Sequence, residues 1–286
     1  MIQVVVTQML NGAIVGALYG IVALGVTLTF GITGVVNFAL GAFMVLGAYF
    51  TWWCHEVAGI PYIPSVFLAV LAVSVLGYLA DAGLFRFTRN HLVNGLLVSI
   101  GLISIVEASV LLIWTATPKN LSYVLPGVIR VAGISVSQIK LVISAALVAV
   151  VAATYVGLTR TWFGRSAFAY AQNPEAAMLM GVNTARLETM VFVYSTSLAA
   201  LGGGLYASLY SIEPSLGGFY ILKGVEAAIL AGVGEVLGSL AGGVILGISE
   251  NVGSIYLPSA LRDAYGLVFL ILILLLKPAG LFGGKK

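Results

Sequence analysis

Three carboxylates interrupt long apolar stretches of this chain, Glu107, Glu226 and Glu250, and Lys223 lies close to the expected outer boundary of a membrane segment. Inside a membrane span such a group costs at least about 2.5 kcal/mol on insertion scales, so it usually faces a cavity or a partner. Lys223 and Glu226 are spaced so that they can pair on one face of a helix. Two readings stay open for them: a structural ion pair, or groups that line a solute path. For Glu107 we consider a structural role at a subunit contact.

Uncharged polar groups in apolar surroundings are the other candidates for a path. Asn37 follows a glycine-rich stretch, residues 31–34, where a helix is expected to break. Non-helical backbone at membrane depth is tolerated only where it is buried in protein or lines a cavity. The residues predicted to line a path are Asn11, Tyr19, Asn37, Gly41, Glu226, Gly232 and Gly234.

The sequence offers no set of residues for catalysis or cofactor binding. A single cysteine, Cys54, excludes an internal disulfide and a multi-cysteine metal site. His55 and His91 fall at an expected membrane edge and turn, and the one Gly-Lys pair, 284–285, belongs to no phosphate-loop motif. We therefore expect no enzyme activity, metal or cofactor in this chain, and a net charge of +3 gives no reason to expect a nucleic-acid partner.

The composition places the chain in a membrane. Hydrophobic residues make up 60% of it and charged residues only 8%, against roughly 25% in soluble domains. The apolar runs are continuous rather than alternating, which favours helices over a β-barrel. The 35 glycines are consistent with close helix packing. We predict one all-α polytopic membrane domain over residues 1–286.

The basic residues predict a topology, because they concentrate on the cytoplasmic side. They form clusters at Arg86 and Arg89, at Arg160, Arg165 and Arg186, and at Lys277, Lys285 and Lys286. Segments 115–138, 211–223 and 251–262 are then external, whereas 160–186 and the C-terminus are cytoplasmic. The predicted spans are 8–30, 39–53, 64–85, 92–114, 141–158, 187–210 and 256–276.

Segment 224–250 must then enter the membrane and return to the same side. It is too short for two helices of about 20 residues, and glycines crowd its centre at 231–238. We expect two short half-helices that meet inside the membrane; the alternative is one kinked helix. Residues 31–38 are a second candidate break, which brings the expected total to about eight membrane segments.

The cytoplasmic segment 160–186 contains the signals of a short helix. Asn173 is a favoured N-cap, Pro174 suits the first helical position, and Glu175 suits the positive end of the helix dipole. Gly181 is a typical C-terminal stop. This predicts a helix of about two turns whose Met/Leu surface docks into a partner's groove; packing against the chain's own membrane domain is the alternative.

Within this segment, Glu175-Ala176-Ala177-x-x-x-Gly181 resembles the loop by which permeases of ATP-binding-cassette (ABC) importers contact their nucleotide-binding subunits. The downstream Ile-x-Leu-Pro part of that loop is absent. A wider resemblance, to the LivH-type branched-chain amino-acid permeases, extends over nearly the whole chain. It rests on residues 11–25, 31–39, Gly164-Arg165, 173–183, 232–234 and 277–282.

The resemblance implies a permease subunit of an importer in a bacterial inner membrane, working by alternating access. Its implied partners are a second, homologous permease in a heterodimer, two ATP-binding subunits that hold ATP and Mg²⁺, and an external solute-binding protein. The implied coupling residues are Gly164, Arg165, Asn173, Pro174, Glu175, Ala176, Ala177 and Gly181. Rival readings are an ion-coupled secondary transporter or channel, and a membrane enzyme or assembly factor.

One departure from the family concerns the solute. Family members usually have His and Glu where this chain has Leu40 and Ala42. The solute is therefore left open between a branched-chain amino acid and a related small molecule such as an amide, urea or an aromatic acid.

Overall fold

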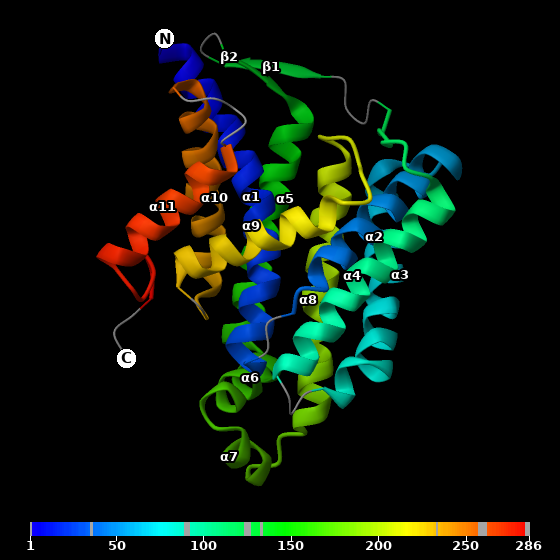
Figure 1. Ribbon diagram of the computed structural model, residues 1–286, viewed down its shortest axis with the longest axis vertical. Helices are drawn as coiled ribbons and strands as arrows, with labels where there is room; N and C mark the ends of the chain where they lie inside the picture. Colours follow the sequence, from blue (N-terminus) through cyan, green and yellow to red (C-terminus); the bar gives the residue numbers. More distant parts are fainter. Residues whose placement is uncertain are drawn as a thin grey trace.

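The computed structural model describes residues 2–34, 37–88, 92–122, 127–131, 134–232, 234–256 and 262–283. Arg89, His91, Lys285 and Lys286 lie outside these ranges. The described chain is almost entirely helical (Figure 1). Its helices are α1 (Ile2–Thr33), α2 (Leu40–Trp52), α3 (Tyr62–Gly83), α4 (Leu92–Trp114), α5 (Gln138–Arg160), α6 (Trp162–Gln172), α7 (Pro174–Leu179), α8 (Thr184–Ala207), α9 (Leu216–Ala231), α10 (Val236–Tyr256) and α11 (Arg262–Leu276).

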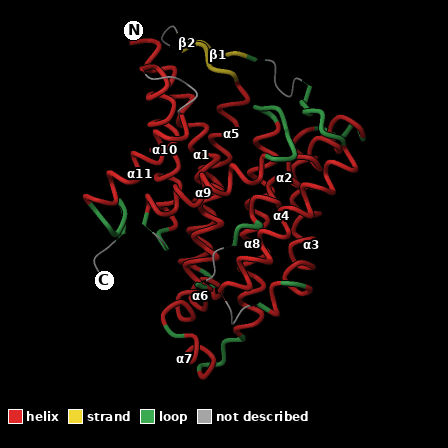
Figure 2. Tube along the Cα trace, viewed as in Figure 1, coloured by secondary structure: helices red, strands yellow, loops and turns green. Residues whose placement is uncertain are grey.

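The expected all-α membrane fold is confirmed. Among the described residues, six helices are long and apolar enough to cross a membrane: α1, α3, α4, α5, α8 and α10. Helices α2, α9 and α11 are shorter, so the expected total of about eight segments stays a prediction. The segment read as an external loop, 115–138, contains a short antiparallel hairpin of β1 (Val128–Val131) and β2 (Ile134–Ser137), shown in yellow in Figure 2.

Helix α1 is the centre of the bundle. Its most apolar 18-residue stretch is 89% buried inside the protein, and it packs against α5, α8, α9 and α10. Glycines set its distance from α10, which runs antiparallel to it. A Cβ atom at Gly16 would lie 2.3 Å from the carbonyl oxygen of Gly243, and one at Gly12 would lie 2.7 Å from that of Gly247. Such backbone contact is the use that membrane helices make of small residues.

A second group of helices packs beside this centre. Helix α2 lies against α8, α3 and α9, and glycines again permit the approach, since a Cβ at Gly203 would meet the Met44 carbonyl oxygen at 1.9 Å. Helices α3, α4 and α5 are peripheral: only 28%, 17% and 28% of their most apolar stretches are buried. Many large apolar side chains on these helices are exposed, as is suitable for contact with lipid.

The break predicted within 31–38 is present between α1 and α2. Helix α1 ends at Thr33, and Gly34 has a φ of +71°, which glycine adopts freely. The Leu40 side chain at the start of α2 lies against Gly25, roughly two turns before the end of α1. The chain therefore turns back along α1, and the short helix α2 begins deep inside the bundle.

The prediction of two short half-helices in 224–250 was wrong in part. The break is where it was expected, with φ of +106° at Gly232 and +94° at Gly234. Helix α9, however, starts at Leu216 and α10 continues to Tyr256, so residues assigned to external loops are helical. Only α9, with 16 residues, is short; α10, with 21, is long enough for a full span.

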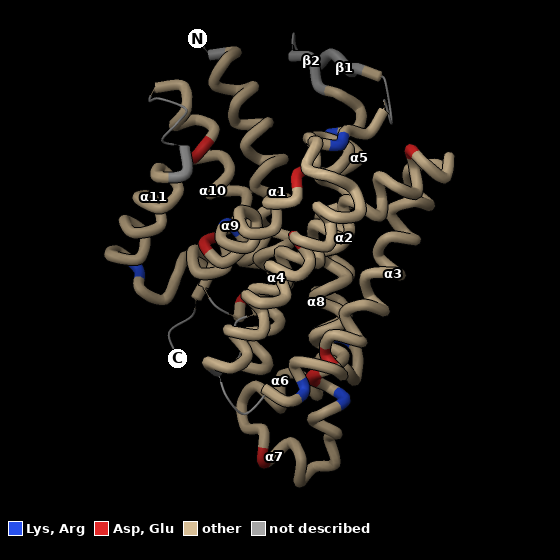
Figure 3. The backbone as a smooth tube through the Cα atoms, turned by 45° about the vertical axis from the view of Figure 1, so that its right-hand side comes forward, with Lys and Arg blue, Asp and Glu red and all other residues tan. Residues whose placement is uncertain are grey.

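The segment formed by α9 and α10 begins and ends toward the same end of the molecule, as expected for a segment that enters the membrane and returns. The loop before α9 and the end of α10 lie toward the end of the molecule that carries β1 and β2, opposite α7 (Figure 1). Helix α9 runs across the bundle and contacts the middle of α1, where a Cβ at Gly224 would lie 2.5 Å from Val22 Cγ1. Figure 3 marks charged positions along the backbone near α6 and adjoining helix ends, and a smaller group on α9.

Candidate functional site

The predicted capped helix is present as α7. Asn173 is its N-cap, with the side-chain Oδ1 accepting a hydrogen bond from Ala176 N at 3.0 Å, and Pro174 occupies the first turn. Gly181, with a φ of +86°, follows the helix end. Leu179 and Met180 are 89% and 84% exposed, while Ala177 is buried. Helix α7 thus contacts α6 and α8 through a small residue and leaves its large apolar side chains uncovered.

A second helix, α6, which the sequence interpretation did not identify, connects α7 to the membrane helices. Thr161 caps it by accepting a hydrogen bond from Gly164 N at 3.3 Å. A Cβ at Gly164 would lie 1.8 Å from the Leu158 carbonyl oxygen, so glycine is required at this corner between α5 and α6. Arg165, the next residue, is exposed.

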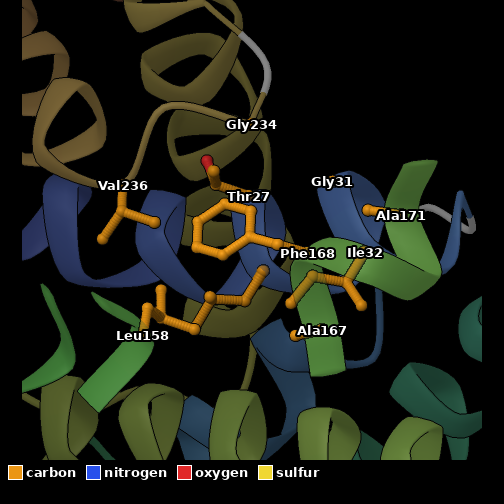
Figure 4. Close-up of a pocket in the computed structure, with 10 residues that line it drawn as sticks. Thr27, Gly31, Ile32, Leu158, Ala167, Phe168, Ala171, Gly234 and Val236 are labelled. Atoms are coloured by element: carbon orange, nitrogen blue, oxygen red, sulfur yellow. The ribbon is translucent and has the colours of Figure 1, made fainter. Parts of the chain in front are cut away.

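A small pocket of about 40 Å³ lies where α6 meets α1, α5 and the start of α10 (Figure 4). The Phe168 ring of α6 points into the middle of it, between Thr27 of α1 and Leu158 of α5. Gly234 and Val236, from the turn between α9 and α10, lie across the pocket. The remaining lining residues are Leu28, Gly31, Ile32, Ala167 and Ala171. Helix α6 is therefore in direct contact with both α1 and the α9–α10 turn.

An ion cluster joins three helices in the interior. Lys223 Nζ of α9 lies 2.8 Å from Glu250 Oε1 of α10 and 3.1 Å from Glu226 Oε2. Tyr19 Oη of α1 donates to Glu250 Oε2 at 3.1 Å. Lys223 and Glu250 are 3% and 0% exposed. The predicted Lys223–Glu226 pair is therefore present, and Glu250 is its unpredicted third member.

The other predicted path residues lie apart from this cluster. Asn11 accepts a hydrogen bond from Lys140 Nζ of α5 at 2.8 Å. Gly41 contacts Gly217 where α2 crosses α9, with its Cβ position 2.3 Å from the Gly217 carbonyl oxygen. Asn37 is 3% exposed, and its Nδ2 has no hydrogen-bond partner among the described residues. A buried donor without a hydrogen-bond partner is uncommon, so Asn37 is the most unusual polar residue near the break between α1 and α2.

Residues 279–283 of the tail pack against the end of α9, where the break before α10 begins. Two hydrogen bonds of 2.9 Å join the tail to the end of α9: Leu281 N donates to the Leu230 carbonyl oxygen, and Phe282 N donates to that of Ala231. The last carbonyls of a helix lack partners within it, so the tail satisfies them. Gly232 and Gly280 touch backbone to backbone: a Cβ at Gly280 would lie 2.5 Å from Gly232 N. This contact leaves no room for a side chain at Gly232 or Gly280.

The structure brings together some predicted residues and not others. Tyr19 and Glu226 meet in the ion cluster, and Gly234 meets the coupling segment at the Phe168 pocket. Asn11, Asn37 and Gly41 occupy separate contacts, and Glu107 lies half-buried on α4 outside the cluster. The sequence interpretation missed Phe168, whose one visible signal was a large apolar residue in a polar segment.

Comparisons with known proteins agree with this architecture. A family profile described as "Branched-chain amino acid transport system / permease component" matches residues 8–276. The permease BraD of a high-affinity branched-chain amino acid transport system from Pseudomonas aeruginosa is 28% identical, over 96% of this chain and 95% of that protein. The corresponding LivH of Escherichia coli K12 is 29% identical, over 96% and 94%.

An archaeal protein, the probable branched-chain amino acid transport permease LivH of Methanocaldococcus jannaschii, is 29% identical over 96% of this chain and 92% of its own length. No solved structure matches the chain. Since the family profile extends over nearly all of the membrane helices described above, this chain belongs to the permease family of branched-chain amino acid transport systems.

Proposed function

We propose that this chain is one membrane-spanning subunit of an ABC importer that moves a branched-chain amino acid or a related small solute across the bacterial inner membrane. The observation that carries the proposal is the capped helix α7, which leaves Leu179 and Met180 uncovered at one end of a membrane bundle. Large apolar side chains held this way suit a groove on a partner protein.

The partners follow from the resemblance and from the relatives. We expect a homologous second permease in a heterodimer, two ATP-binding subunits that hold ATP and Mg²⁺, and an external solute-binding protein. The end that carries α6 and α7 is then cytoplasmic, together with the C-terminus. The chain itself is expected to bind no cofactor and to do mechanical rather than chemical work.

The mechanism we propose is alternating access driven through α7. Closure of the ATP-binding subunits displaces α7, and α6 moves with it because the two helices are packed together. Phe168 then presses on α1 and on the α9–α10 turn, where Gly232 and Gly234 permit backbone rearrangement. Rearranged helices around the breaks at 34–39 and 232–235 open the path to the other side.

The test is transport by the purified assembly in proteoliposomes, with L-leucine as the probe. The double variant Leu179→Ser/Met180→Ser is expected to lose ATP-driven uptake, because it removes the docking surface and leaves the cap intact. Phe87→Ser, a 76% exposed aromatic residue just after α3, is the matched control and should keep uptake. Normal uptake by the double variant contradicts the docking role.

The same preparation separates the importer from its rival. An ion-coupled secondary transporter would use the intramembrane carboxylates Glu226 and Glu250 to bind a proton or a cation. Uptake that follows an ion gradient and needs neither ATP nor the solute-binding protein would replace the importer proposal with that one.

A further inference from the structure

An open cavity of about 400 Å³ lies at the end of the molecule opposite α7. It is formed by the end of α8, the loop 208–215 and the first turns of α9. Its lining residues are Tyr206, Tyr210, Ser211, Glu213, Ser215, Leu216, Phe219 and Tyr220. In the topology proposed above, this is the external end, where a solute-binding protein delivers its cargo.

Aromatic rings dominate the cavity and hold one another in place. The Tyr206 ring centroid lies 5.3 Å from that of Tyr210 and 5.1 Å from that of Tyr220. Phe219 lies 5.3 Å from Tyr220, in an edge-to-face arrangement. The electron-rich faces of such rings attract a cation, most strongly where several rings surround it.

The charge of the cavity comes from one carboxylate. Glu213 is the sole charged residue among those that line it, and it is exposed. The neighbouring basic residue, Lys119, is directed elsewhere, since its Nζ lies 5.3 Å from the centroid of the Trp52 ring and donates to Thr117 Oγ1 at 3.1 Å. The cavity is thus an aromatic site with a net negative charge.

The loop that carries Glu213 is fixed before any ligand arrives. Ile212 forms two backbone hydrogen bonds with Lys119, of 2.8 and 3.0 Å, and Ser211 Oγ donates to Asn120 Oδ1 at 2.6 Å. Tyr206 Oη donates to the Ser211 carbonyl oxygen at 3.0 Å. A pre-formed site loses less ordering entropy on binding than a mobile loop would.

We propose that this cavity is the outer binding site for the ammonium group of the imported solute, with the apolar part of the solute against the rings. The proposal rests on the importer function and narrows the solute class to amines and zwitterionic amino acids, against urea and aromatic acids. Tyr220 connects the site to the interior, because its ring centroid lies 5.6 Å from that of Tyr19, which binds Glu250 in the ion cluster.

The direct test is binding of tetramethylammonium, a cation without other recognition features, to the intact assembly in nanodiscs, measured by saturation-transfer NMR. Glu213→Gln and Tyr210→Leu are each expected to raise its dissociation constant about tenfold, whereas Tyr210→Phe keeps the ring and should bind normally. Glu56→Gln, an exposed carboxylate near the same end but outside the cavity, is the control for charge.

The outcomes separate this site from the importer function. L-leucine should displace tetramethylammonium from the native assembly. No binding to the native assembly, as when a partner subunit covers the cavity, or unchanged binding in Glu213→Gln, overturns the ammonium site even if ATP-driven leucine uptake persists. Normal cation binding without ATP-driven uptake of any solute would instead refute the importer and leave the cavity's chemistry standing.

Discussion

Lys223, Glu226 and Glu250 form a bonded set in the interior of this permease. Lys223 is held by two carboxylates and Glu250 by an ammonium and a phenol, so each buried ion has an opposite charge or a donor next to it. Buried pairs of this kind contribute little net stability, but the loss of one member leaves an uncompensated charge. The cluster therefore fixes α9 against α10 and α1 chiefly by making their separation costly.

Glu250→Gln tests this reading of the cluster. It leaves Lys223 with Glu226 as its remaining anionic partner, and removal of one member of a buried pair typically costs about 3–5 kcal/mol. We expect a clearly lower thermal unfolding midpoint for the purified protein, whereas Tyr19→Phe should lower it only slightly. The triple variant Lys223→Met/Glu226→Gln/Glu250→Leu, which removes every charge of the cluster, should recover part of the loss. Equal midpoints for Glu250→Gln and native protein would refute the role.

Phe168 is the one large side chain of α6 that lines the pocket between α6, α1 and the α9–α10 turn, and it is half exposed. Phe168→Ala empties the pocket between α6, α1 and the 234–236 turn, so movement of α6 is no longer transmitted. We expect ATP hydrolysis by the assembly to continue while leucine uptake per ATP falls several-fold. Trp162→Ala, an exposed aromatic residue of the same helix outside the pocket, should leave the ratio unchanged. The measurement is the ratio of the rate of leucine uptake to the rate of ATP hydrolysis in proteoliposomes.

At the level of helices, the pairing of α1 with α10 depends on glycine. Gly16→Ala places a Cβ 2.3 Å from the Gly243 carbonyl oxygen, closer than any stable contact, so the two helices must separate. We expect a lower unfolding midpoint and less folded protein in the membrane. Gly101→Ala on α4, where the added Cβ meets nothing within 4 Å, is the matched control. Fluorescence-detected size-exclusion after stepwise heating measures both variants; similar profiles would contradict the close packing.

Helices α2 and α9 and the C-terminal tail, all shorter than a full membrane span, pack differently from the long helices. Helix α2 starts deep in the bundle, α9 crosses it, and the C-terminal tail packs against the end of α9. Gly232 is buried against the tail, whereas Gly34, Gly234 and Glu235 are exposed. The positive φ at Gly34, Gly232 and Gly234 makes these breaks the places where the chain can change direction at the least steric cost.

The molecule as a whole has two different ends, and the proposed mechanism assigns each a side of the membrane. One end carries α6 and α7 for the ATP-binding subunits, and the other carries the hairpin and the aromatic cavity (Figure 1). The ion cluster lies between them.

Cysteine labelling tests this orientation. In a Cys54→Ser background, we expect Ser215→Cys to react with a membrane-impermeant maleimide in spheroplasts. Glu175→Cys and Lys277→Cys should react only after the membrane is opened. Labelling of Glu175→Cys in sealed spheroplasts would place α7 outside and defeat the importer proposal.

Local patterns were sufficient to predict part of this protein. The apolar runs and scarcity of charge predict a helical membrane bundle, because a span must satisfy its own backbone and exclude charge. Asn173, Pro174 and Gly181 predict α7, because capping depends on neighbours within one turn. The glycines at 31–34 and 232–234 mark both breaks, because positive φ is a local requirement.

What required the tertiary structure depends on contacts between residues far apart in the chain. Positive-inside counting treated Lys223 as a boundary charge, but Glu250 neutralises it inside the bundle, so α9 and α10 extend beyond their predicted limits. The Phe168 pocket draws on four separate segments, and the outer cavity exists because residues 117–120 hold the 211–213 loop in place. The burial of a charge and the shape of a cavity are properties of the packed helices, and no single segment contains them.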